Sequence, residues 1–226
     1  MLSLVLVSLL GCDAPAPPCA GTVLAGDALP CTCGSTRVDA VDALPATCTC
    51  TGGAVSCEQP PADDPASADL PTPFSAAQIR QGMPKGLSIR LETSGPSGVL
   101  SRDEWVVTKS EPAGVDIRYT SFSAEGKAIG GSEQKHDSWD TLEGHARFPR
   151  ERATRERATV ETRLGSFEGW KYVVTETEEG AEGSPAVVRT SSYWFADALP
   201  GAPVRMVVEQ GGTEVVRMEQ VSRKGP

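Results

Sequence analysis

Residue types that could perform acid, base or nucleophilic chemistry are sparse in this sequence. The two histidines, His136 and His145, lie nine positions apart, and neither has a second metal ligand at helical spacing. The run His136-Asp137-Ser138 contains the residue types of a catalytic triad, but adjacent side chains point in different directions. Ser166 is second in its glycine-flanked run rather than third, so it does not match a nucleophile elbow. We therefore predict no catalytic residue, no cofactor and no metal, and we expect that the protein is not an enzyme.

Sulfur chemistry is concentrated at the beginning of the chain. Leu9-Leu10-Gly11-Cys12 ends an apolar run that starts at Leu2 and is too short to span a bilayer as a helix. This stretch resembles the lipobox of bacterial lipoproteins. The resemblance implies a signal peptide over residues 1–11, a diacylglycerol on the thiol of Cys12, and a protein anchored by lipid to a membrane of the bacterial cell envelope, facing the periplasm or the exterior. The alternative is a plain secretory signal cut near Gly11.

An even number of cysteines remains once Cys12 carries lipid. Thiols pair outside the cytosol, so we predict three disulfides within a small module of residues 19–57, with their connectivity left open. Paired Cys-x-Cys thiolates can also chelate Zn or Cu(I), but no histidine lies near them, and we favour disulfides. Residues 48–57 resemble the core of von Willebrand factor type C modules, which implies a short hairpin clamped by disulfides. The six cysteines are Cys19, Cys31, Cys33, Cys48, Cys50 and Cys57.

Two proline-rich stretches flank this module. Residues 12–18 indicate the lipid anchor followed by a polyproline spacer, and residues 58–73 contain five prolines and three aspartates. Fixed proline φ angles and like charges keep such a chain extended, so we expect a linker that holds the main domain, residues 74–226, away from the module. The net charge of −9 argues against a nucleic-acid partner.

The main domain begins with signals for a short helix. Ser75 and Gln78 are spaced as a capping box, and Gly82 is placed to end the helix. A second short helix is expected after a cap at Asp137 or Ser138. Its apolar face would carry Trp139, Leu142 and Ala146.

From Gly86 onward apolar and polar residues alternate, which is typical of half-buried antiparallel strands. We expect eight or nine strands, with a two-residue hairpin turn at Gly211-Gly212. Strand candidates are residues 87–91, 105–107, 115–120, a short strand near 128–129, a basic strand before Leu164, then 167–175, 186–195, 204–209 and 213–221.

A series of motifs marks the C-terminal half. Leu164-Gly165-Ser166-Phe167, Trp170-x-Tyr172, Tyr193-Trp194-Phe195-Ala196-Asp197 and Leu199-Pro200-Gly201-Ala202-Pro203-Val204-Arg205 resemble uncharacterised secreted bacterial β-domains that are related to the half-barrel of periplasmic lipoprotein carriers. The resemblance covers about residues 110–226. It implies a mainly β fold with a curved antiparallel sheet, whose apolar concave face is closed by one or two short helices. It transfers no catalytic residue.

Two groups of side chains are candidates for ligand binding. Large apolar residues could line a cleft for a lipid or a hydrophobic peptide, although most of them must fill the core. An arginine-rich stretch could bind phosphate, a lipid headgroup or an acidic glycan, or it could form the charged edge of a sheet, which we favour. The cleft candidates are Trp170, Tyr172, Trp194 and Met206, and the anion-patch candidates are Arg150, Arg152, Arg155 and Arg157.

These patterns together predict an exported, membrane-anchored lipoprotein that binds a protein or lipid ligand at the cell envelope. Two alternatives stay open. One is a carrier or chaperone for a lipid or a lipoprotein, which requires an apolar cavity. The other is a purely structural spacer.

Overall fold

A computed structural model divides the chain into two compact units, Met1–Cys57 and Glu58–Pro226. The structure describes residues 23–24, 31–33, 35–38, 47–51, 54–58, 63–178 and 186–226. Cys12, Cys19 and the predicted signal peptide, residues 1–11, lie outside these residues, so both the signal peptide and lipid attachment stay predictions. Within the described ranges, no helix has the length and apolar character needed to cross a membrane.

The first unit is built from short strands. A three-stranded sheet has the order β1-β4-β5, formed by β1 (Val23–Leu24), β4 (Thr47–Thr51) and β5 (Ala54–Glu58). Strand β2 (Cys31–Cys33) pairs antiparallel with β3 (Thr36–Val38). Cys33 is buried and disulfide-bonded. The pairing of all six cysteines stays a prediction.

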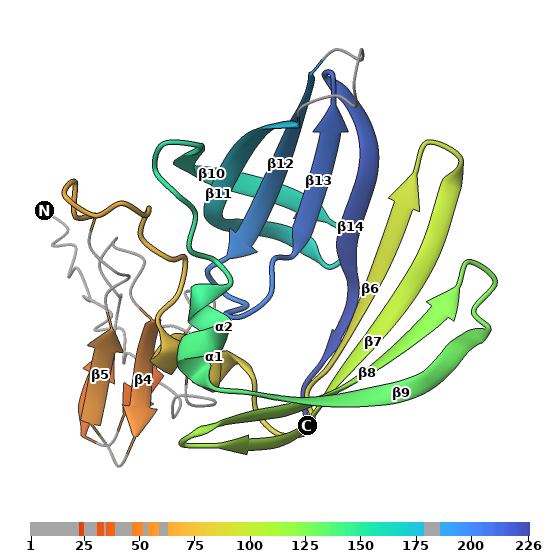
Figure 1. The fold of residues 1–226 in the computed structure, drawn as a ribbon. Coiled ribbons are helices and arrows are strands. Elements are labelled where there is room, and N and C mark those ends of the chain that lie inside the picture. The colour runs from red at the N-terminus through yellow and green to blue at the C-terminus, as the bar shows by residue number, and fades with distance from the viewer. Residues whose placement is uncertain are drawn as a thin grey trace, which may run out of the picture. The chain divides into compact units, whose positions relative to one another are not determined.

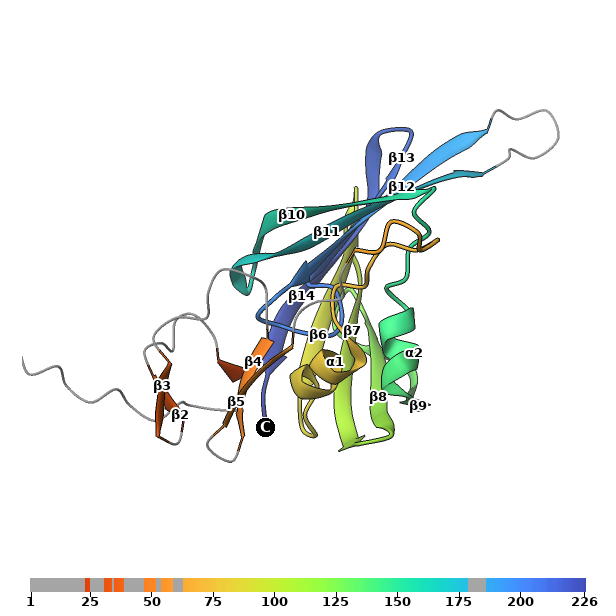
Figure 2. The same cartoon turned by 90° about the vertical axis from the view of Figure 1, so that its left-hand side faces the viewer.

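The second unit is organised by a nine-stranded antiparallel sheet in the order β10-β11-β12-β13-β14-β6-β7-β8-β9. Two meanders are joined where the last strand pairs with the first, with Arg223 opposite Ile89. The sheet curves around two short helices (Figures 1 and 2). The predicted fold class is confirmed. The strands are β6 (Ser88–Gly95), β7 (Gly98–Glu111), β8 (Gly114–Ser123), β9 (Ala128–Asp137), β10 (Ala153–Thr162), β11 (Gly165–Glu178), β12 (Val187–Ala196), β13 (Arg205–Gln210) and β14 (Thr213–Lys224).

The helices α1 (Ala76–Gly82) and α2 (Trp139–Gly144) lie on the concave side of the sheet. Ser75 caps α1 in the predicted capping box, because its hydroxyl accepts from the Gln78 amide and the Gln78 side chain accepts from the Ser75 amide. Ser138 caps α2. Each helix is too short to be stable alone, so packing must hold it. The shared core includes Phe74, Ile79, Met83, Trp139, Leu87, Ile89, Leu91, Val107, Ile117, Tyr172 and Phe195.

Strand β9 is longer than the sequence indicates. A short strand near residues 128–129 is expected, whereas Ala128–Asp137 forms ten residues of strand. Its side chains are almost all exposed because β9 is an edge strand, so burial imposes no alternation on its sequence. Charged residues such as Glu133 and Lys135 are common on free edges, where they disfavour pairing with another chain.

Residues 63–73, which we call the strap, are packed onto the second unit rather than extended as a linker. Residues 70–73 are buried. The Leu70 amide donates to the Phe148 carbonyl at 2.9 Å. The Tyr172 hydroxyl donates to the Pro71 carbonyl at 2.5 Å. The expectation of an extended chain is therefore wrong for this part of the linker.

Arg150 supplies the charge that the strap needs to fold back. Its guanidinium lies 2.6 Å from the Asp63 carboxylate, and it donates to the carbonyls of Asp64 and Ser67 at 3.1 and 3.2 Å. The aspartates therefore do not simply repel one another. The neutralising residue is 87 positions away from Asp63, which is why the local sequence does not reveal it.

Candidate functional site

An apolar cavity of about 230 Å³ lies between the helices and the sheet. Its walls come from β7, β8 and β12, from both helices, and from the loop after β12. Apolar and aromatic side chains dominate the lining, with only a few polar groups at the rim. The lining includes Phe74, Ile79, Met83, Trp105, Ile117, Tyr119, Leu142, Phe148, Tyr193, Phe195 and Ala202.

Ring contacts fix the aromatic wall of the cavity. Trp105 and Tyr119 are paired across β7 and β8, with their ring centres 5.4 Å apart in an edge-to-face arrangement. Phe148 stacks on Tyr193 at 5.1 Å. Such contacts stabilise the rings in defined orientations by about 0.5–1.5 kcal/mol per pair. The cavity wall is therefore held by packing.

Two side chains of β14 form hydrogen bonds to the loop after β12, which lies beside the cavity. Gln220 is fully buried, and its amide donates to the carbonyls of Ala202 and Pro203 at 3.1 Å each. Arg223 donates to the carbonyls of Gly82 and Pro200, at 2.7 and 3.2 Å. Burial lowers the pKa of Arg223 to about 10, which still leaves it charged at neutral pH.

The cavity lining has few polar groups, and its one carboxylate is engaged in hydrogen bonds. The Glu143 carboxylate accepts from the Ala76 amide at 2.8 Å and from the Thr72 hydroxyl at 3.3 Å, so it joins α2 to the strap and to the start of α1. Burial, with Asp137 and Glu133 nearby, raises the pKa of Tyr119 and keeps its phenol neutral. The cavity can therefore bind an apolar group, and besides the tyrosines its ionisable lining side chains are Glu143, which is hydrogen-bonded, and His145.

The four cleft candidates do not line this cavity. Tyr172 is fully buried in the core, and Trp170 and Met206 are partly buried. Trp194 lies between Tyr193 and Phe195 in β12 and packs in a separate small cluster with Val160 and Val204. The structure therefore brings Trp170 and Tyr172 together and places Trp194 on the other face. The sequence indicates Trp105 and Tyr119 as inward residues but gives no sign of a cavity beside them.

The four arginines of the predicted anion patch all have partners in the described chain. Arg155 and Arg157 lie on β10, which is an edge strand of the sheet. Burial lowers the pKa of Arg155, whose guanidinium stacks on an indole. A role in anion binding stays a prediction. The partners are the strap for Arg150, Glu176 at 3.4 Å for Arg152, the Trp170 ring at 3.5 Å for Arg155, and Asp197 at 2.5 and 3.1 Å for Arg157.

The histidines take separate positions. Exposed His136 has its Nδ1 2.6 Å from the Asp116 carboxylate on the neighbouring strand. His145 caps the C-terminal end of α2 at the rim of the cavity. Among the described residues, no group of three or more His, Cys, Asp and Glu side chains could hold a metal ion.

Comparisons with known proteins match the chain to solved structures at low similarity, and two of these are as follows. No family model matches the sequence, and no curated protein matches it. One structure is a candidate lipoprotein of Parabacteroides distasonis ATCC 8503, at 12% identity and a TM-score of 0.46. The other is a candidate exported protein with a YmcC-like fold from Bacteroides fragilis NCTC 9343, at 15% identity and a TM-score of 0.46. Each alignment covers 63% of this chain, and 96% and 97% of the other chains. Similarity at this level assigns no function.

Proposed function

We propose that the second unit is a binding module that takes one small apolar group, such as the end of an acyl chain, into the cavity beside Trp105 and Tyr193. The observation that carries the proposal is the apolar lining of a cavity of about 230 Å³ in an otherwise packed core. This favours the carrier alternative over the purely structural one.

The size of the cavity limits what enters it. An engineered apolar cavity of about 150 Å³ holds benzene, and pockets for drug-sized ligands range from about 300 to 1,000 Å³. The cavity of this protein falls between these sizes. One chain end or one ring would be enclosed, while the rest of a larger ligand stays outside.

The chemistry of the lining supports binding without covalent change. The one carboxylate in the lining, on Glu143, is engaged by the Ala76 amide and the Thr72 hydroxyl. Besides the tyrosines, the other ionisable side chain in the lining is His145, which is exposed at the end of α2. Affinity would come from removal of apolar surface from water, at about 25 cal/mol per Å².

The cellular setting of the proposal rests on the sequence. The lipobox-like stretch ending at Cys12 supports export and a lipid anchor. Export would place the other six cysteines in an oxidising compartment, where they would pair. A von Willebrand factor type C-like module would then lie between the anchor and the binding unit. Mass spectrometry of the mature N-terminus tests this setting, since an unmodified N-terminal residue contradicts the anchor.

Binding can be measured with N-phenyl-1-naphthylamine, a neutral dye whose fluorescence rises in apolar surroundings. We expect saturable binding to the full chain and displacement of the dye by a medium-chain fatty acid. Ala202→Phe places a ring at the cavity lining and should weaken binding at least about tenfold, equivalent to 1.4 kcal/mol.

Ala198→Phe is the matched control, because Ala198 is exposed in the same loop and does not line the cavity. It should bind the dye like the unchanged protein. Absence of saturable binding to the unchanged protein, or equal weakening by both variants, would contradict the proposal and favour a structural spacer.

A further inference from the structure

A polar cleft of about 350 Å³ lies on the face of the sheet opposite the helices. Directly paired residues on neighbouring strands share a face, and the register places Trp194, Arg205, Glu219, Glu92 and Arg102 in one row across five strands. Trp194 packs away from the helix-covered core. The whole row therefore lies on the opposite face.

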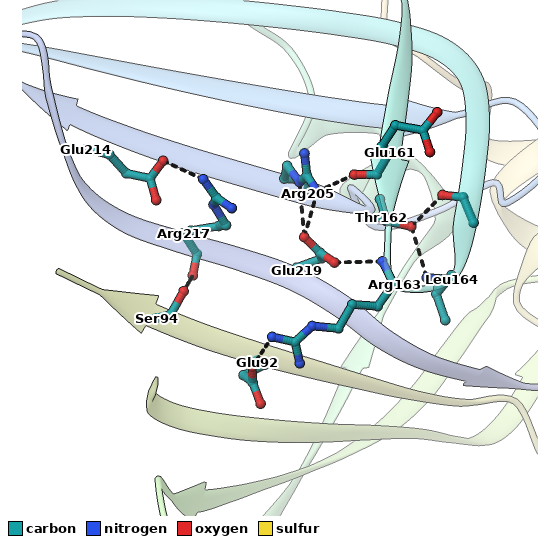
Figure 3. Close-up of polar contacts among 11 residues, drawn as sticks. Glu92, Ser94, Glu161, Thr162, Arg163, Leu164, Arg205, Glu214, Arg217 and Glu219 are labelled. Carbon is teal, nitrogen blue, oxygen red and sulfur yellow. Dashed lines mark hydrogen bonds and ion pairs between the residues drawn. The ribbon is translucent and has the colours of Figure 1, made fainter. Parts of the chain in front are cut away.

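The end of the β10–β11 hairpin closes over this row. Arg163, in the turn of the hairpin, donates from its backbone amide to Glu219 at 2.8 Å. Its guanidinium lies 2.7 Å from the Glu92 carboxylate. Figure 3 shows Arg163 reaching from the hairpin to both strands, so the turn forms one wall of the cleft.

Both buried carboxylates of the cleft are already engaged by donors. One oxygen of Glu92 faces Arg163, and the other accepts from Arg102 at 3.1 Å. One oxygen of Glu219 accepts from the Arg163 amide, and the other accepts twice from Arg205, at 2.8 and 3.1 Å. The cleft therefore offers little further acceptor capacity.

In contrast, the arginines of the cleft have N–H donors that are not used in hydrogen bonds among the described residues. A guanidinium has five N–H donors. Arg217 uses one nitrogen to bond Glu214 at 2.8 Å, and its Nε is buried without a hydrogen-bond partner in the described chain. Arg163 and Arg205 also bond through only part of their guanidinium groups. An oxyanion is the kind of ligand that accepts from several such donors at once.

The charged side chains around the cleft can be counted in the same way as its hydrogen-bond donors and acceptors. Arg102, Arg163, Arg205 and Arg217 face three carboxylates, those of Glu92, Glu214 and Glu219. The side chain of Glu161 turns away (Figure 3), and its carboxylate accepts from the Ser166 hydroxyl at 2.6 Å. One positive charge is in excess among these ion-paired groups, and the carboxylate of Glu161, a residue that also lines the cleft, balances this charge when it is counted.

We propose that this cleft binds a small oxyanion, with phosphate-type chemistry, between Arg217 and Arg163. The site is separate from the apolar cavity, because the two lie on opposite faces of the sheet. Arg217 would donate through the exposed guanidinium N–H groups that do not bond Glu214, and the exposed guanidinium edge of Arg163 would complete the contact. The ligand is either a free phosphate or the phosphate of a lipid headgroup.

Isothermal titration of the full chain with inorganic phosphate at low ionic strength tests the site, because screening by salt weakens such contacts. A parallel titration uses phosphatidylglycerol vesicles, with phosphatidylcholine vesicles as the reference. We expect saturable binding in at least one arm. Response to phosphate identifies the free anion, and response to phosphatidylglycerol vesicles alone identifies the headgroup.

Arg217→Gln should weaken binding at least about tenfold, or 1.4 kcal/mol. Ser94→Asp, which adds a carboxylate to the cleft lining, should weaken it similarly and serves if the first variant does not fold. Arg90→Gln is the matched control, because Arg90 forms an exposed ion pair with Glu104 on the same face outside the cleft.

Absence of binding in both arms, or equal affinity for Arg217→Gln and Arg90→Gln, overturns the oxyanion site. Either result leaves the dye experiment on the apolar cavity unaffected. Conversely, loss of dye binding in Ala202→Phe should not change the phosphate titration. The two proposals can therefore fail independently.

Discussion

The Tyr172 hydroxyl donates a 2.5 Å hydrogen bond to the Pro71 carbonyl, which joins a fully buried side chain of β11 to the strap. Burial raises the pKa of Tyr172, so its hydroxyl remains a donor at neutral pH. The strap is consequently part of the folded second unit, although its composition is that of an extended spacer.

Tyr172→Phe should lower the free energy of unfolding by about 1–3 kcal/mol, because the Pro71 carbonyl loses its donor in a buried place. Urea unfolding measures the change. Tyr193→Phe is the control, since the described chain contains no hydrogen bond from its hydroxyl. Equal stability of the two variants would contradict a role for the Tyr172 hydrogen bond.

Arg150→Gln should release the strap while leaving the sheet folded, because it removes the contacts to Asp63, Asp64 and Ser67. Hydrogen exchange at the Leu70 amide, which bonds the Phe148 carbonyl, should become about tenfold faster. Arg152→Gln removes an exposed ion pair two residues away and should leave this rate unchanged. Equal rates in the two variants would show that Arg150 does not hold the strap.

The ion pair of Glu92 should make stability depend on pH on the acid side. The hydrogen bond from Arg163, with a further contribution from Arg102, lowers the pKa of Glu92 below 4.5. A carboxylate with a lowered pKa in the folded state stabilises that state above the unfolded pKa, and the contribution is lost as the pH falls through the folded pKa. Acidification below about pH 4.5 should therefore reduce this part of the stability.

Glu92→Gln should cost about 1.5–3 kcal/mol near neutral pH, and its deficit relative to the unchanged protein should shrink as the pH falls. Urea unfolding over a pH series measures both effects. Glu104→Gln, which removes the exposed pair with Arg90, should cost less than about 1 kcal/mol. A deficit for Glu92→Gln that is constant with pH would contradict the predicted role of its charge.

Gly169→Ala should destabilise the sheet by about 3 kcal/mol or more, because a Cβ at this position would lie 1.9 Å from the Phe195 carbonyl oxygen. The conflict is with backbone of the paired strand, which cannot move aside as a flexible side chain can. Gly131→Ala is the control, since a Cβ there has open space around it. Thermal unfolding should separate the two, and a small effect of Gly169→Ala would show that the β11–β12 pairing can yield.

Local signals in the sequence were sufficient for the helices and most strands. Ser75 and Gln78 are three positions apart, so their capping box can be recognised without knowing the fold. The alternation of Ile89 and Leu91 with polar neighbours likewise predicts the inward face of β6, and both residues are buried. A strand shows alternating apolar and polar residues only where one of its faces is buried. Strand β9 is almost entirely exposed, so its sequence predicts only a short part of it.

The candidate sites depend on pairings between distant parts of the chain. The strap depends on Arg150, and the polar cleft depends on a register that sets Glu219 beside Glu92. Neither pairing follows from local periodicity. Alternation within β12 places Trp194 opposite to Tyr193 and Phe195, but only the register, which pairs Trp170 with Phe195, shows that Trp194 and Trp170 lie on different faces.

Strand β14 is the last strand in sequence order yet lies in the interior of the sheet, between β13 and β6. Its pairing with β6 connects residues as far apart as Ser88 and Lys224. Until β14 has been synthesised, the earlier meander has no neighbour on its inner side, and such long-range pairing is slow to form. The sheet thus cannot be completed before β14 is available to join the two meanders.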